Sequence, residues 1–269
     1  MHAYVINLAR SVDRRAHITA ELKKTGVDYE ITTAVDGREL DLSDPAIVVP
    51  SLATKTVSMV GAAGCALSHL NAYKKIIADG LDAALVLEDD VILPSDLGIL
   101  ADAVADHLTG AEVVLLSYST PYPPCKLSRE GSIRLPSSRR LALPIDINQW
   151  LMSSGAYIIT REACERMIDC VLPVRVPTDD WRFFYREGAL DRVRCVTPVP
   201  APNNYKLVST IGSYTLGSGL RARLLWPLVN HKIPVLYQAL SYRRQRIQRR
   251  WSRSELVDMP FVEKPSRLG

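Results

Sequence analysis

Three consecutive acidic residues, Glu88, Asp89 and Asp90, come directly after an apolar run at 83–87. A run that is apolar at every position is typical of a central strand covered on both faces of a sheet. Because ligands of open α/β sheets bind beyond the carboxyl ends of the strands, these acids stand where a ligand would bind. Alternation along an extended chain would direct Glu88 and Asp90 to one side and Asp89 to the other.

Two carboxylates on one side of a strand end predict a site for a divalent cation, Mn²⁺ or Mg²⁺, because both ions accept oxygen ligands. The cation would complete its shell with diphosphate oxygens. As a Lewis acid it would offset the charge that builds up on a departing nucleoside diphosphate. The alternative is that the three acids only cap a turn or face water.

A second acidic pair, Asp179 and Asp180, follows Pro177 at the expected start of a helix. Displacement of a diphosphate by an acceptor hydroxyl needs a general base that takes the hydroxyl proton. Either carboxylate is a candidate for this role. The alternative for both is an N-cap of the helix that contains Trp181.

Basic residues flank the end of the first expected strand, at Arg10, Arg14 and Arg15. On a helix Arg14 and Arg15 point in different directions, so at most one of them can reach a ligand together with Arg10. A solvated basic turn is the alternative.

Three further positions have two interpretations each. Asp36, which precedes a glycine, could accept hydrogen bonds from a ribose or a base, or form an Asx turn. Gly61 could let the backbone approach a ligand at a helix start, although packing explains a glycine equally well. His69 lies on the apolar stripe of its expected helix, which favours a core histidine over one that faces the metal edge of the sheet.

The rest of the pattern predicts alternating strands and helices. Strands are expected at 4–8, 29–33, 83–87, 112–118 and 156–160, and helices at 11–26, 63–79 and 95–107. The first strand, helix and strand form a βαβ unit with parallel strands. A stretch rich in Pro, Ser and Arg at 119–144 predicts a long loop that acts as a lid or binding element. The predicted fold is α/β, with a mainly parallel central sheet and helices on both faces.

Four sequence blocks carry a family resemblance. They are VINLARSVDRR at 5–15, AVDG at 34–37, GAAGCALSH at 61–69 and ALVLEDDV at 84–91. In this order they resemble glycosyltransferase family 25, the group of lipooligosaccharide galactosyltransferases and procollagen galactosyltransferases. The resemblance continues weakly through 154–159 and 177–180, and departs from the family at Thr178, where a hydrophobic residue is usual, and at Asp180-Trp181.

The resemblance implies a GT-A type, Rossmann-like fold, an inverting mechanism and most often UDP-galactose as the donor. Metal ligation by Glu88 and Asp90 is expected from their place at the strand end. Alignment with the family favours Asp179 as the base, whereas Asp180 resembles the acid of the base motif in other GT-A enzymes. Donor-binding roles are expected for Asn7, Leu8, Arg10, Arg15, Asp36, Gly61, Ser68, His69 and Asp89.

Composition is that of an ordinary globular protein, with 47% hydrophobic and 23% charged residues in 269. The five cysteines include no Cys-x-x-Cys pair, which argues against both a disulfide framework and a thiolate metal site. No run approaches the roughly 20 apolar residues of a membrane span, and no signal peptide is visible, so the expected location is the cytoplasm.

The net charge of +4 is unevenly placed, with a cluster of arginines near the end of the chain. The cluster consists of Arg243, Arg244, Arg246, Arg249, Arg250 and Arg253. Mixed with apolar residues at 224–251, it predicts a segment that lies on an anionic membrane surface, where each basic residue contributes about 1 kcal/mol. A helix packed on the domain, or nonspecific RNA binding, is the alternative. We therefore expect a transferase domain at 1–220 and a basic amphipathic extension at 221–269, peripheral on the inner face of a bacterial inner membrane.

Together these patterns predict transfer of a hexose from a UDP-sugar to a hydroxyl of a lipid-linked surface glycan. Galactose is the first candidate for the hexose. Two other classes remain open. A sugar-nucleotide nucleotidyltransferase shares such a sheet and acidic site, but needs a Gly-rich loop after the first strand, where this chain has Ala9-Arg10-Ser11. A basic nucleic-acid-binding protein would bind with a steep salt dependence, and no specific nucleic acid is expected as a partner.

Overall fold

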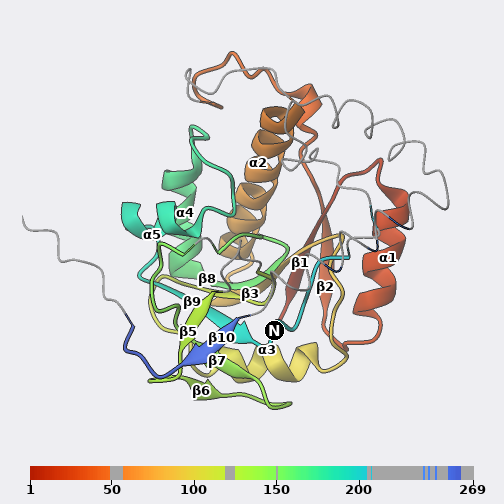
Figure 1. Ribbon diagram of the computed structural model, residues 1–269. Coiled ribbons are helices and arrows are strands. Elements are labelled where there is room, and N and C mark those ends of the chain that lie inside the picture. Colours follow the sequence, from red (N-terminus) through yellow and green to blue (C-terminus); the bar gives the residue numbers. More distant parts are fainter. Residues whose placement is uncertain are drawn as a thin grey trace, which may run out of the picture.

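The computed structural model describes residues 1–48, 57–118, 125–149, 151–204, 207, 239, 242, 246 and 254–261. Helices cover both faces of an eight-stranded sheet, and a second sheet has two strands (Figure 1). The strands are β1 (Ala3–Asn7), β2 (Tyr29–Thr33), β3 (Ala83–Glu88), β4 (Glu112–Leu115), β5 (Lys126–Ser128), β6 (Ile133–Arg134), β7 (Arg140–Ala142), β8 (Ala156–Thr160), β9 (Arg192–Thr197) and β10 (Glu255–Val257). The helices are α1 (Val12–Leu22), α2 (Val57–Ala78), α3 (Leu97–Ala105), α4 (Arg161–Val171) and α5 (Trp181–Glu187), and η1 (Gly37–Glu39) is a 3₁₀ turn.

The large sheet has the strand order β2-β1-β3-β8-β4-β9-β7-β6. β1 runs parallel to β2 and β3, as the predicted βαβ unit requires, and β4 runs parallel to β9. β8 lies between β3 and β4 and is antiparallel to both, and β7 is antiparallel to β9. The sheet is therefore mixed, and the prediction of a mainly parallel sheet is wrong. β8 is buried at every position. A run of apolar residues indicates that both faces of a strand are covered, but it does not indicate the direction in which the strand runs.

The two faces of the sheet carry separate hydrophobic cores. On one face, Tyr73 of α2, Met167 of α4 and Trp181 of α5 pack against alternate residues of the strands. On the other face, Ile18 of α1 and Leu100 of α3 pack against the intervening residues of the same strands. The expected helices on both faces are confirmed.

The long loop expected at 119–144 is largely structured in its described part. It contains β5, β6 and β7, and the last two extend the large sheet beyond β9. These strands have two or three residues each, too few for a pattern of alternation to show in the sequence. β9 itself, at Arg192–Thr197, also had no counterpart among the expected strands.

The end of the described chain returns to the body of the protein. β10, blue in Figure 1, pairs in parallel with β5. The Ser254 hydroxyl lies 3.1 Å from that of Tyr118 and 2.7 Å from that of Thr197. The expected domain boundary at 220/221 lies outside the described residues. So does the arginine cluster, except for Arg246. None of the described helices is long and apolar enough to cross a bilayer.

Two glycines fix the place of α2 against the segment that follows β2. A Cβ on Gly64 would lie 2.7 Å from the Gly37 nitrogen and 2.8 Å from the Val35 oxygen, both backbone atoms. A Cβ on Gly37 would collide with the Val60 carbonyl. The backbone of 35–37 therefore lies directly on α2. This contact explains both glycines by packing.

Gly64→Ala is expected to lower the free energy of unfolding by about 1–3 kcal/mol, because a methyl group would press against backbone that cannot rotate away. Gly98→Ala in α3 is the matched comparison, since its Cβ would lie 3.3 Å from the Thr25 oxygen, a contact that a shift of a few tenths of an ångström relieves. Both substitutions gain about 1 kcal/mol of helix propensity, so their difference reports the contact. Urea unfolding of both variants measures it, and equal stability would mean that 35–37 can move off the helix.

Candidate functional site

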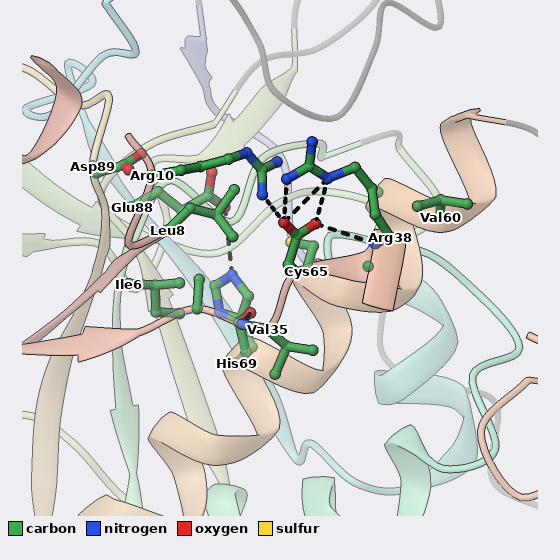
Figure 2. A pocket seen from close by; sticks show the side chains of 15 residues that line it. Ile6, Leu8, Arg10, Val35, Arg38, Val60, Cys65, His69, Glu88 and Asp89 are labelled. Carbon is green, nitrogen blue, oxygen red and sulfur yellow. Dashed lines mark hydrogen bonds and ion pairs between the residues drawn. The ribbon is translucent and has the colours of Figure 1, made fainter. Parts of the chain in front are cut away.

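A cavity of about 130 Å³ lies at the carboxyl ends of β1 and β3, between α2 and the segment that follows β2 (Figure 2). Because these strands are parallel neighbours, with Ile6 opposite Glu88, their last residues reach the same edge of the sheet. Seven of the nine residues expected to bind the donor line the cavity: Leu8, Arg10, Asp36, Gly61, Ser68, His69 and Asp89. Glu88 lines it as well.

Glu88 points toward α2 and β8. Its carboxylate accepts a hydrogen bond of 2.6 Å from the Ser154 hydroxyl and lies 3.4 Å from His69 Nε2. Burial alone would raise the pKa of Glu88, but His69 and Ser154 lower it below its usual value. Glu88 is therefore held as a carboxylate that faces the cavity.

Asp89 and Asp90 form ion pairs with the same side chain, Arg14. Arg14 Nη2 lies 2.5 Å from Asp89 Oδ1 and 2.8 Å from Asp90 Oδ2. The Asn7 amide donates a hydrogen bond of 2.7 Å to Asp89, and the Asn203 amide donates one of 3.3 Å to Asp90. Asn7 thus lies beneath Asp89 rather than in the cavity wall.

The acidic cluster has more negative charge than Arg14 can balance. Burial is the main reason why the pKa values of Asp89 and Asp90 are raised, and the charge of Glu88 raises both further. Three carboxylates beside one guanidinium fit a site that would bind a divalent cation. The side chains differ in direction, however: Glu88 contacts Ser154 and His69, whereas Asp90 contacts Arg14 and Asn203.

Of the three arginines near β1, Arg14 reaches the acidic cluster. Arg15 is exposed and does not line the cavity, so the structure does not place it at the site where the sequence analysis expected it. Arg10 lies at the cavity wall and pairs with Asp36. The expectation that Arg14 and Arg15 cannot both reach the site holds, since consecutive residues of α1 point in different directions.

Asp36 forms the Asx turn that was one of its two interpretations. Its Oδ1 accepts a hydrogen bond of 3.1 Å from the backbone N–H of Arg38, and its carboxylate also pairs with the Arg10 and Arg38 guanidinium groups. Its pKa is lowered, chiefly by the hydrogen bond from the Arg38 side chain. Two arginines around one carboxylate leave a net positive charge at this wall of the cavity.

Ser68 and His69 are tied to the fold as well as to the cavity. The Ser68 hydroxyl donates to the Gly64 carbonyl at 2.6 Å and accepts from the Val35 N–H at 2.8 Å, which holds the 34–36 segment on α2. His69 is 1% exposed, and its Nδ1 lies 2.7 Å from the Tyr157 hydroxyl. His69 is thus a buried histidine whose other nitrogen faces Glu88.

The structure separates the two candidate bases. Asp180 is the N-cap of α5: it accepts from the Phe183 N–H at 3.3 Å and pairs with Arg182. Asp179 instead accepts a 3.0 Å hydrogen bond from the Ser153 N–H, on the loop that carries Ser154. Burial raises the pKa of Asp179, and the charge of Glu88 raises it further. Of the two candidate bases, Asp179 is therefore the one whose carboxylate interacts electrostatically with Glu88.

Sequence reasoning missed the loop before β8. Ser153 has a φ of 109°, a conformation that residues with a side chain rarely adopt. Its carbonyl accepts from Trp181 Nε1 at 3.1 Å, and its hydroxyl lies 3.1 Å from that of Ser117. Ser154 and Asn203 also contact the acids from distant parts of the chain. The resemblance at 154–159 was the one signal that pointed to this loop.

Comparison with known proteins shows the family of the chain. Residues 1–181 match the pattern of glycosyltransferase family 25, described as an LPS biosynthesis protein. A glycosyltransferase 25 family member of Anopheles gambiae is 25% identical over 232 residues, which are 76% of this chain and 37% of that protein. The lacto-N-neotetraose biosynthesis glycosyltransferase LgtE of Neisseria meningitidis is 27% identical over 198 residues, 70% of this chain and 69% of that one.

A solved structure, of a glycosyltransferase involved in glycosylation of the major capsid of PBCV-1, aligns with 78% of this chain and 94% of that one at 7% identity. Its TM-score of 0.38 is too low to support an argument about the fold. The chain spans 37% of the length of the mosquito relative.

The fold and the cavity define a class of α/β proteins whose ligand site lies beyond the carboxyl ends of neighbouring strands. Within this class, the chain belongs to glycosyltransferase family 25.

Proposed function

We propose that this chain is an inverting, metal-assisted glycosyltransferase of the GT-A type. In this proposal it moves a hexose from a UDP-sugar to a hydroxyl of a lipid-linked surface glycan, and galactose is the first candidate for the hexose. The observation that carries the proposal is the surplus of carboxylates beside one arginine, Arg14: Glu88 and Asp89 line the cavity, and Asp90 adjoins them. Family membership supports the reaction class over a nucleotidyltransferase or a nucleic-acid-binding protein.

In the proposed reaction, Mn²⁺ or Mg²⁺ held by Glu88 and Asp90 would offset the charge of the departing diphosphate. Arg14 keeps Asp89 and Asp90 in place through its two contacts. The net positive wall formed by Arg10, Asp36 and Arg38 suits the phosphates of the donor.

Asp179 is the proposed general base. It would take the proton of the acceptor hydroxyl as that oxygen attacks the anomeric carbon from the face opposite the diphosphate. Its raised pKa moves its basicity toward neutral pH, where a base is most effective. The Ser153 N–H fixes the orientation of its carboxylate.

Thermal unfolding in the presence of single nucleotides tests the donor. UDP-galactose, UDP-glucose, UDP-N-acetylglucosamine and GDP-sugars are compared with and without Mn²⁺. We expect one UDP-sugar to stabilise the protein only when the cation is present. Stabilisation by no sugar nucleotide under any of these conditions would contradict the proposed class.

The acceptor class and the location rest on the arginine cluster. We propose that this cluster holds the enzyme on an anionic leaflet at the cytoplasmic side of a bacterial inner membrane, where a lipid-linked acceptor would lie. Removing all residues after 241 would not test this, because β10 and its pairing with β5 would be lost as well.

Replacing Arg243, Arg244, Arg249 and Arg250 with Gln is therefore the sharper experiment. Each contributes about 1 kcal/mol near an anionic surface, so vesicle binding is expected to weaken by a factor of roughly 10² to 10³. Sedimentation with phosphatidylglycerol vesicles measures binding, and phosphatidylcholine vesicles are the control. Unchanged sedimentation with the anionic vesicles would refute membrane attachment through this cluster.

A further inference from the structure

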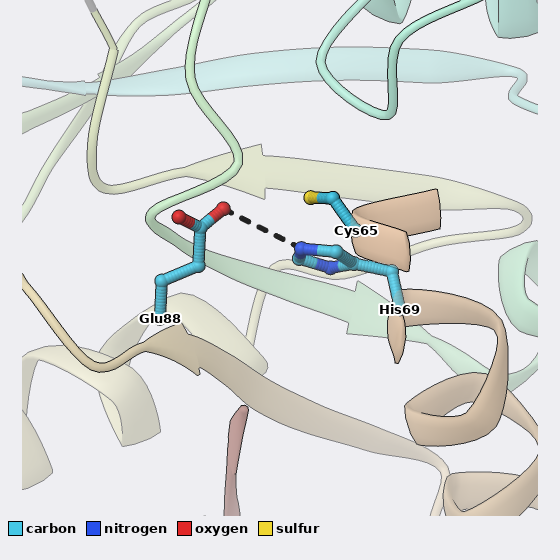
Figure 3. Close-up of side chains that lie close together, drawn as sticks. All are labelled: Cys65, His69 and Glu88. Carbon is cyan, nitrogen blue, oxygen red and sulfur yellow. Dashed lines mark ion pairs between the residues drawn. The ribbon is translucent and has the colours of Figure 1, made fainter. Parts of the chain in front are cut away.

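Three side chains that can bind a metal converge at the inner end of the cavity (Figure 3). The Cys65 sulfur, a His69 ring nitrogen and a Glu88 carboxylate oxygen all lie within 4.8 Å of one another. Cys65 and His69 are four residues apart on α2, so they project from the same face of the helix. Glu88 meets them from the end of β3. The sequence argument against a thiolate site considered only Cys-x-x-Cys pairs and did not cover this combination.

The Tyr157 hydroxyl lies behind His69, 2.7 Å from Nδ1, and donates to the Tyr73 hydroxyl at 3.0 Å. With a metal ion bound, His69 Nδ1–H would donate to the Tyr157 oxygen, and the lone pair of Nε2 would face the cavity. Histidines that bind metals are commonly oriented in this way, through a partner of the nitrogen that does not bind.

Nε2 is buried, and no described residue forms a hydrogen bond with it. The nearest oxygen, Glu88 Oε1, is 3.4 Å away, longer than the roughly 2.7–3.2 Å of an N–H···O bond. A metal ion between Nε2 and Glu88 Oε1 would satisfy both atoms. Two ligands of one tetrahedral zinc ion, each about 2.1 Å from it, are separated by about 3.4 Å.

Cys65 supplies the third ligand. Its sulfur lies within 4.8 Å of the ligand atoms of His69 and Glu88. A thiol that coordinates a metal loses its proton. That proton would pass to solvent.

We propose that Cys65, His69 and Glu88 form a three-ligand site for a borderline divalent cation such as Zn²⁺ or Co²⁺, with its open position toward the cavity. The inference rests on the proposed function, since both place the cation on Glu88; here Cys65 and His69 take the place of Asp90, which contacts Arg14 and Asn203. Sulfur and nitrogen ligands favour such ions over Mg²⁺, which requires oxygen. A donor phosphate oxygen or a water would complete the coordination.

Titration of the metal-free protein with Co²⁺ alone tests the site, with no nucleotide present. We expect one equivalent of Co²⁺ to produce a thiolate-to-cobalt charge-transfer band in the near ultraviolet, together with visible bands of four-coordinate cobalt. Zn²⁺ should displace the cobalt and abolish both. Absence of the charge-transfer band in the unaltered protein would overturn the proposal.

Matched cysteine variants assign the band. Cys65→Ser should lose the charge-transfer band, whereas Cys170→Ser, which removes another partly exposed thiol, should keep it. Circular dichroism of each variant checks that it is folded. Loss of the band in Cys170→Ser alone would assign it to a surface thiol and refute the site. NMR of the unaltered protein gives a readout that needs no variant. Zn²⁺ should shift the signals of a single buried histidine.

The failure of this inference can be told apart from the failure of the proposed function. Transfer from a UDP-sugar supported by Mg²⁺, without a thiolate band, would refute the ligand set and leave the function standing. A thiolate band in a protein that neither binds nor transfers any sugar nucleotide would confirm the ligand set and refute the function.

Discussion

Asp179→Asn is expected to lower kcat for sugar transfer by about 10²- to 10⁴-fold, the usual contribution of a general base. The amide keeps the size of the side chain and can still accept the hydrogen bond from the Ser153 N–H. It cannot take up the acceptor proton. Binding of the donor should be unchanged, because the amide keeps the hydrogen bond that holds the Ser153–Ser154 loop against Glu88. Steady-state kinetics with a saturating acceptor, together with calorimetric donor titration, measures both quantities.

Asp180→Asn is the matched control for this experiment. Asp180 caps α5 and pairs with Arg182, so its loss should cost about 1 kcal/mol of stability or less, since Asn is also a good cap. Transfer should continue at close to the normal rate. The reverse pattern, with kcat lost in Asp180→Asn and kept in Asp179→Asn, would assign the base to Asp180.

Asp90→Ala and Glu88→Gln are each expected to abolish stabilisation by a UDP-sugar that depends on the cation. A donor at 100 times its Kd stabilises a protein by about 2.7 kcal/mol. For a chain of this size this corresponds to a rise in Tm of roughly 5–10 °C. Both variants should lose this rise because each removes a proposed ligand of the cation.

Glu39→Gln is the control for the acidic pair, since Glu39 is an exposed acid of η1 that does not line the cavity. It should show the full rise in Tm. Differential scanning fluorimetry with and without Mn²⁺ compares all four proteins. A full rise in both Asp90→Ala and Glu88→Gln would show that these carboxylates only support the fold.

The first part of the fold could be predicted from the sequence because its signals are local. The βαβ unit follows from a helix with apolar spacing between two short apolar runs, and the acids follow directly on an apolar run. The direction of β8 could not be predicted, because its apolar residues report burial alone. Short strands such as β6 and β7 depend on pairing across the sheet rather than on their own residues.

The cavity could be predicted in outline, but the partners of its acids could not. Glu88 was expected to share its direction with Asp90, yet its contacts are with Ser154 and His69. Alternation describes a continuous strand, and β3 ends at Glu88, after which the backbone turns. Asn203, which contacts Asp90, is 113 positions away in the chain, a distance at which a single sequence carries no pairing signal.

The pairing of β5 with β10 has a consequence for how the chain is made. Residues 126–128 leave the ribosome well before 255–257, so a nascent chain holds β5 without its partner while more than a hundred residues are added. During that interval the open backbone groups of β5 can pair with other chains. Products that terminate early, before Ser254, keep this edge permanently and should accumulate as aggregates, so expression tests of shortened chains need to retain the last described strand.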